Sequence, residues 1–191
     1  MFAPRAGSNT ANVVLGIDPG LTRCGYAIVR PGVQPELVSL GVLATPAGDA
    51  LPTRLAHLQH DLSVLFDEYS PVAVAVERVF FQHNTRTAMS VGQASGIVLA
   101  LAASRGCEVA QYTPTQVKNS VAGWGGADKS AVARMVQMRF GLRTVPTPAD
   151  AADAAALALC HLAAQPFAQS VAHAQSHAQS QSAARAKVRA Q

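Results

Sequence analysis

Residues 72–77, Val-Ala-Val-Ala-Val-Glu, are apolar at every position before the final acid. A strand with one solvated face alternates apolar and polar residues, so this run predicts a strand that is covered on both faces. Such strands usually lie at the centre of a sheet, in parallel company, with helices packed above and below. This run therefore indicates a layered α/β architecture.

The segments around this strand predict a mixed sheet. Apolar runs at 12–18, 24–29 and 36–43 are separated by short turn signals, Pro19-Gly20 and Pro31-Gly32, which favours three strands in an antiparallel meander. A fifth strand is expected at 108–112. Helices are expected between Leu51 and Pro71, at about 85–104, from Thr113-Pro114 onward, at about 128–140 and at about 149–164. The predicted fold is a five-stranded mixed sheet, its first three strands antiparallel, with helices on both faces.

The chain of 191 residues, 49% of them hydrophobic, suits one domain with tails. We expect a flexible arm at 1–10, the folded domain at 11–164, and a disordered tail at 165–191, where Ala, Gln and Ser dominate. No apolar stretch is long enough to cross a membrane, and the N-terminus lacks the apolar core of a secretory signal. Three widely spaced cysteines without zinc-ligand spacing are expected to be buried free thiols, which favours a cytoplasmic location.

Positive and negative charges are segregated along the chain. Residues 11–77 hold 3 basic and 7 acidic residues, whereas residues 78–143 hold 8 basic and 2 acidic ones. A basic middle segment between acidic flanks fits a surface that binds a polyanion beside a carboxylate cluster. A chance distribution is the alternative.

Four carboxylates stand at positions that could form one site. Asp18 ends the first predicted strand and Glu77 ends the strand at 72–77, so both reach the same sheet edge if these strands are parallel neighbours. Asp150 and Asp153, three residues apart, open the last predicted helix and project to nearly one side of it. Each acid also has a purely structural explanation: a turn before Pro-Gly for Asp18, a solvated strand end for Glu77, and favourable helix N-terminal charges for the other two.

Oxygen ligands from several elements suit Mg²⁺ or Mn²⁺, and four clustered carboxylates without a cation would repel one another. Two such ions about 4 Å apart can activate a water molecule and stabilise the leaving oxygen of a phosphodiester. The carboxylates therefore predict a metal-dependent phosphodiester hydrolase.

Five motifs in this order resemble the RuvC family of bacterial Holliday junction resolvases, and they span about residues 11–164. The motifs are Gly16-Ile-Asp18-Pro-Gly20 with Gly25-Tyr26, Val76-Glu77-Arg78-Val79-Phe80, Val91-Gly92-Gln93-Ala94 with Gly96, Gln116-Val117-Lys118 followed by Gly123 through Lys129-Ser130, and Ala149-Asp150 through Asp153-Ala154. The resemblance implies an RNase H-like fold, a homodimer, and Mg²⁺-dependent nicking of four-way DNA junctions in recombination and repair.

The family's carboxylate tetrad falls on Asp18, Glu77, Asp150 and Asp153. By analogy Asp18 would bridge two Mg²⁺ ions, with Glu77 on one side and the two helix acids on the other; Mn²⁺ is an alternative. The resemblance implies paired nicks of like-polarity strands that leave 5′-phosphate and 3′-hydroxyl ends. The family's usual partners are the branch-migration motor proteins RuvA and RuvB, and no membrane is involved.

Basic and aromatic residues acquire expected roles through the same resemblance. Lys118 and Lys129 match family lysines near the scissile phosphate, and we count them as catalytic and DNA-binding. Phe80 is expected to stack on unpaired bases at the junction centre. Arg78 and Arg86 are expected to contact phosphates, with plain surface charge as the alternative. Trp124, in the glycine-rich segment 123–126, could either pack or stack.

Three other functions compete with this interpretation. A RuvC-like relative that acts on RNA would share the fold and the metal site. An actin-like phosphotransferase also has an Asp-x-Gly-x-Thr loop, as at Asp18–Thr22, but it needs a second related domain that this length does not supply. A non-catalytic junction-binding module would be expected to lack one of the four acids, and none is missing.

Overall fold

The computed structural model describes residues 12–78 and 85–165, except for the side chains of residues 85–87. The strands form one five-stranded sheet with the order β3-β2-β1-β4-β5. β1 pairs antiparallel with β2, and β2 with β3, whereas β1–β4 and β4–β5 are parallel. Their bounds are β1 Val14–Asp18, β2 Arg23–Arg30, β3 Glu36–Ala44, β4 Ala73–Glu77 and β5 Glu108–Tyr112. The predicted mixed sheet with an antiparallel meander is confirmed.

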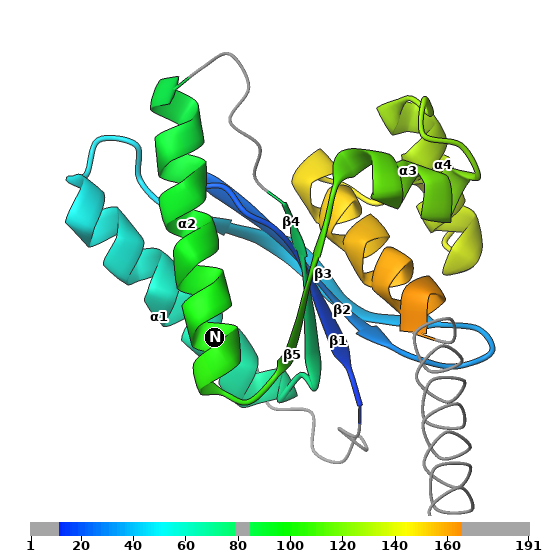
Figure 1. Cartoon of the computed structure of the whole chain (residues 1–191), viewed down its shortest axis with the longest axis horizontal. Helices are drawn as coiled ribbons and strands as arrows, with labels where there is room; N and C mark the ends of the chain where they lie inside the picture. The colour runs from blue at the N-terminus through cyan, green and yellow to red at the C-terminus, as the bar shows by residue number, and fades with distance from the viewer. Residues whose placement is uncertain (1–11, 79–84, 166–191) are drawn as a thin grey trace, which may run out of the picture.

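Helices cover both faces of the sheet, as predicted (Figure 1). One face carries α1 (Leu51–Tyr69) and α2 (Thr85–Ser104). The other face carries α3 (Pro114–Ala122), α4 (Lys129–Arg139) and a final helix at 149–165, drawn in yellow to orange and hereafter called the C-terminal helix. This helix continues one residue past its predicted end. The predicted arm at 1–10 and the tail from 166 onward lie outside the described residues.

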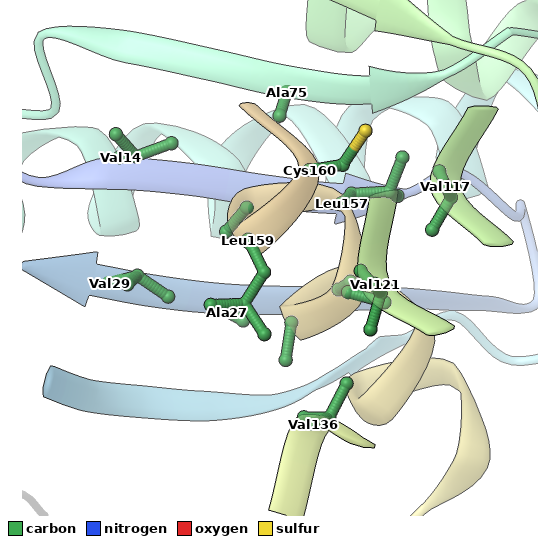
Figure 2. Close-up of a cluster of buried hydrophobic side chains, with 14 of the residues drawn as sticks. Val14, Ala27, Val29, Ala75, Val117, Val121, Val136, Leu157, Leu159 and Cys160 are labelled. Carbon is green, nitrogen blue, oxygen red and sulfur yellow. The ribbon is translucent and has the colours of Figure 1, made fainter. Parts of the chain in front are cut away.

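Strand β4 has the two covered faces that its sequence predicts. Ala73 and Ala75 belong to the apolar core on the C-terminal helix side, whereas Val74 and Val76 belong to the core under α1 and α2. Figure 2 shows the first of these cores, in which side chains of the C-terminal helix meet side chains from the sheet, α3 and α4. Because both faces are dry, β4 is fixed in register and the position of Glu77 at its end is fixed with it.

The C-terminal helix approaches the sheet at two glycines. A methyl group at Gly16 of β1 would lie 2.0 Å from the Ala154 carbonyl oxygen, and one at Gly25 of β2 would lie 2.0 Å from that of Asp150. No larger residue fits there without moving the helix backbone. The buried alanines of this helix complete the close contact: Ala151, Ala152, Ala154, Ala155, Ala156 and Ala158.

Local signals explain where the helices near the site begin. Thr113 caps α3 in a capping box, in which its side chain accepts a hydrogen bond from the Gln116 amide and the Gln116 side chain accepts one from the Thr113 amide. Asp128 caps α4 by accepting from the Ala131 amide at 2.7 Å. Both caps fix helix starts that carry predicted site lysines.

The structure also tests the cysteine prediction and shows how much space surrounds the glycines of α2. Cys24, Cys107 and Cys160 are free thiols, but only Cys24 and Cys160 are buried; Cys107 is half-buried, since it follows the turn after α2. Gly92 and Gly96 lie in the interior of α2, and within the described residues nothing lies within 4 Å of a methyl group at either one. Among the described helices, none is long and apolar enough to span a membrane.

Candidate active site

Asp18 and Glu77 lie at the carboxyl ends of two neighbouring parallel strands. β1 and β4 pair in register from Val14 with Ala73 to Ile17 with Val76, which puts the next residue of each strand side by side at one sheet edge. Glu77 is also in register with Tyr112 of β5, and the chain turns there into α3. The sequence-based placement of both acids at this edge is confirmed.

A pocket of about 250 Å³ opens at this edge. It brings together three of the four predicted carboxylates, Asp18, Glu77 and Asp153, and both predicted lysines, Lys118 and Lys129. Its apolar wall comes from α3, α4 and the C-terminal helix, through Pro114, Val117, Val132, Ala156 and Leu157. Charged groups of both signs therefore line one pocket beside an apolar wall.

Asp18 is the acid of the pocket whose ionised form is disfavoured by its surroundings. Burial, the charge of Glu77 and a hydrogen bond with the Glu77 carboxyl together raise the pKa of Asp18 from 3.8 to about 8. The charges of Asp153 and Asp150 are smaller contributions to the same rise in pKa. Such a carboxylate is stabilised by a nearby cation, because a cation favours the ionised form that burial and like charges oppose.

The two acids of the C-terminal helix contact cations that come from different elements. Nε of Arg23, at the start of β2, donates to Oδ2 of Asp150 at 2.7 Å. Nζ of Lys129, at the start of α4, donates to Oδ2 of Asp153 at 3.1 Å, and this contact raises the pKa of Lys129. Asp153 lines the pocket, whereas Asp150 is turned toward Arg23 and does not line it.

The donor chemistry of the four acids suits a hard divalent cation, because three of them offer carboxylate oxygens to the pocket and Asp150 stands one helical turn from Asp153. Within residues 12–78 and 85–165, however, no three Asp, Glu, His or Cys side chains converge closely enough to hold an ion as they stand. As the structure stands, Asp150 contacts Arg23 and Asp153 contacts Lys129. The four acids fit a metal site whose formation requires those two side chains to leave their cationic partners.

Other predicted DNA-contacting residues are placed only in part. Arg78 is exposed directly after Glu77, and its backbone amide donates to the Tyr112 carbonyl at 2.8 Å, which ties the end of β4 to β5. Phe80 and the side chain of Arg86 lie outside the described residues, so their predicted roles stay predictions.

Sequence reasoning missed Arg23 as a member of this site. Arg23 and Asp150 are 127 residues apart in sequence, and only the fold joins them. A signal was present in composition, since residues 11–77 hold only 3 basic residues and Arg23 follows the Pro19-Gly20 turn by three positions.

The chain matches, over residues 14–161, the family model described as crossover junction endodeoxyribonuclease RuvC. The chain belongs to the RuvC family. Two curated members of the family are similar to it over 78% of its length. The RuvC of Leifsonia xyli subsp. xyli is 51% identical over 150 residues, and the match covers 72% of that protein. The RuvC of Salinispora arenicola is 50% identical over 151 residues, and the match covers 86% of that protein.

Solved RuvC structures have the same fold. The structure of T. thermophilus RuvC in complex with a Holliday junction substrate is 38% identical, with a TM-score of 0.75, and the match covers 78% of this chain and 92% of that one. The yeast mitochondrial Holliday junction resolvase Ydc2 is 16% identical with a TM-score of 0.59, which supports the fold alone. The RNase H-like fold expected from the sequence motifs is confirmed.

Proposed function

We propose that this RuvC family member resolves Holliday junctions, the four-way DNA junctions of recombination and repair, by metal-dependent nicking. The observation that carries the proposal is the pocket at the carboxyl edge of β1 and β4, where Asp18, Glu77 and Asp153 face Lys118 and Lys129. The relatives named above as crossover junction endodeoxyribonucleases, and the T. thermophilus relative bound to a Holliday junction substrate, supply the substrate class.

The carboxylates of Asp18, Glu77, Asp150 and Asp153 would hold two Mg²⁺ ions, with Mn²⁺ as a substitute. Bound there, the ions would activate a water molecule and stabilise the leaving oxygen of the phosphodiester. The raised pKa of Asp18 supports this assignment. Asp18 and Glu77 lie close together, and both can be ionised at low energetic cost only when a cation is bound beside them. Asp150 would join the site by leaving Arg23.

Lys118 and Lys129 would hold the scissile phosphate in the pocket. Lys129 is exposed apart from its contact with Asp153, so its ammonium can exchange that carboxylate for a phosphate oxygen while Asp153 turns inward. Lysine suits this exchange because it binds as a compact point charge on a flexible stem. Hydrolysis in this arrangement would leave a 5′-phosphate and a 3′-hydroxyl. Phe80, Arg78 and Arg86 would contribute further DNA contacts around the junction centre.

A homodimer would place two such pockets on strands of like polarity, so that paired nicks resolve the junction symmetrically. The open surface at Gly92 and Gly96 of α2 supports a contact with a second copy, because no described part of the same chain uses the close approach that these glycines permit. Action on chromosomal DNA in the cytoplasm, together with the motor proteins RuvA and RuvB, completes the proposal.

The test is cleavage of a synthetic four-way junction, labelled in turn on each strand, with Mg²⁺, Mn²⁺ or EDTA, against a linear duplex of the same sequence. The proposal expects symmetric nicks in two like-polarity strands of the junction, ligatable ends, and no cutting in EDTA. Equal cutting of the duplex would contradict junction specificity. Cutting of structured RNA but not of the junction would favour the RNA-acting alternative.

A further inference from the structure

Trp124 is an exposed aromatic side chain close to the candidate site. The residue is 61% exposed and lies in the glycine-rich loop between α3 and α4. Tryptophan combines a large apolar ring with a polar N–H group and is enriched at interfaces. Val121 and Ala127, on either side of the loop, are buried in the apolar core, whereas Trp124 between them is not.

The glycines of this loop hold the indole in place. Gly123 ends α3 in the left-handed conformation, with a φ of 85°. A methyl group at Gly126 would lie 2.2 Å from Cζ3 of Trp124, so the six-membered ring rests directly on the Gly126 backbone. The ring therefore packs against the Gly126 backbone while most of the residue faces solvent, which leaves aromatic surface available for a base to stack on.

The same loop lies beside the candidate site. A methyl group at Gly125 would lie 2.8 Å from Cγ2 of Thr115 and 3.2 Å from Oδ1 of Asn119, so the loop packs against the first turns of α3. Pro114 and Lys118, on those same turns, line the carboxylate pocket. At its other end the loop leads into Lys129, which also lines the pocket.

The charge around Trp124 favours a nucleic acid as its partner. Residues 113–143 hold five basic residues and a single acid, and that acid, Asp128, is engaged as the cap of α4. Proteins that hold nucleic acid strands combine basic side chains, which contact phosphates, with aromatic side chains, on which bases stack.

We propose that Trp124 stacks on a nucleotide of the DNA strand bound at the carboxylate pocket, outside the site of cleavage. The inference rests on the proposed function, because it takes the substrate to be a DNA junction. Stacking on Trp124 would be a second DNA contact beside the phosphate contacts of the lysines. It would depend on the aromatic face of the base rather than on the phosphate charge.

The test uses the fact that Trp124 is the single tryptophan of the chain. Full-length protein in EDTA, which prevents cutting, is titrated with an unlabelled four-way junction while tryptophan emission is followed, and binding is measured in parallel by the anisotropy of a labelled junction. We expect quenching that saturates over the same concentration range as binding. Binding without a change in emission would overturn the inference while leaving the proposed function standing. Absence of binding would overturn both.

Variants separate stacking from charge. Trp124→Ala is expected to weaken junction binding on the order of tenfold without changing the salt dependence, whereas Lys118→Ala is expected to lower the slope of log affinity against log salt by about 1. Gly126→Ala keeps the indole but displaces it, so it should reduce quenching as well as affinity. Trp124→Phe should retain most of the affinity.

Met138→Ala is the matched control, because Met138 is a 72% exposed apolar residue of α4 near the end opposite Lys129. An equal loss of affinity in Met138→Ala, or a reduced salt slope in Trp124→Ala, would contradict stacking. Emission that changes with protein concentration alone would place Trp124 between copies of the chain and would also overturn the inference.

Discussion

Asp18 destabilises the folded chain wherever it is ionised without a cation. Since its pKa is raised from 3.8 to about 8, the folded chain binds this proton more tightly than the unfolded chain does. The contribution of Asp18 to the free energy of unfolding is therefore fully present below about pH 4, and it is lost as pH rises toward 8. In EDTA, Asp18→Asn should raise the free energy of unfolding by roughly 1–3 kcal/mol at pH 8 and by little at pH 4. Urea unfolding measures this; a pH-independent difference between variant and parent would contradict it.

Arg23 competes with a metal ion for Asp150. The Arg23–Asp150 contact is half-exposed, and pairs of this kind contribute about 0.2–1 kcal/mol. Arg23→Gln should therefore tighten binding of Mn²⁺ by about twofold to fivefold in calorimetric titrations of DNA-free protein. Arg105→Gln, which removes an ion pair with Asp67 of α1, is the control and should leave metal affinity unchanged. Weaker metal binding in Arg23→Gln would show that Arg23 supports the site rather than competing for its ligand.

At the scale of elements, the contact between the C-terminal helix and β2 positions the helix acids. Gly25→Ala would place a methyl group 2.0 Å from the Asp150 carbonyl oxygen and 2.5 Å from its carbon, so the start of the helix must move. We expect a loss of roughly 1–3 kcal/mol in stability, with junction cleavage reduced more than junction binding. Gly48→Ala, with open space around the new methyl group, is the control. Unfolding midpoints and cleavage rates measure both; a Gly25→Ala variant with parental cleavage would contradict this positioning.

Most elements could be predicted from sequence because their patterns are local. Each of three sequence patterns predicts its structure without reference to the rest of the chain. They are the two-sided apolar run of β4, the Pro-Gly turns and the Thr113-Pro114 helix start. The pairing of Asp150 with Arg23 could not be predicted in this way, because it depends on where the C-terminal helix crosses β2. For the same reason Asp150 and Asp153 looked equivalent in sequence, although the fold gives them different partners and only Asp153 lines the pocket.

At the scale of the whole molecule, a substitution in α2 can test dimerisation without destabilising the fold of the single chain. Since nothing described lies within 4 Å of a methyl group at Gly92, the Cβ of a leucine there has room within one copy, and the substitution also gains helix propensity. Gly92→Leu should therefore keep or raise thermal stability while lowering the molecular mass measured by light scattering. An unchanged dimer mass would remove this face of α2 from the interface.

The arrangement of charge in the whole molecule was only partly predictable. The sequence places an excess of basic residues at 78–143. The fold shows that two of them, Lys118 and Lys129, come to the acids at the carboxyl edge, whereas Arg105 pairs with Asp67 on α1, over the other face of the sheet. A charge count along the chain cannot make this distinction, because it depends on which face of the sheet each helix covers.

The central claim is that Asp18 and Glu77, at the carboxyl edge of β1 and β4, are catalytic residues for cleavage of the DNA junction. The most direct measurement compares parent, Asp18→Asn and Glu77→Gln at equal junction occupancy, set by anisotropy in Mg²⁺, and follows the first nick over time. The account predicts that both variants bind the junction at least as tightly as the parent, because each removes a negative charge facing phosphate, while the nicking rate falls at least 10³-fold. Nicking at the parental rate by either variant at equal occupancy would contradict the account.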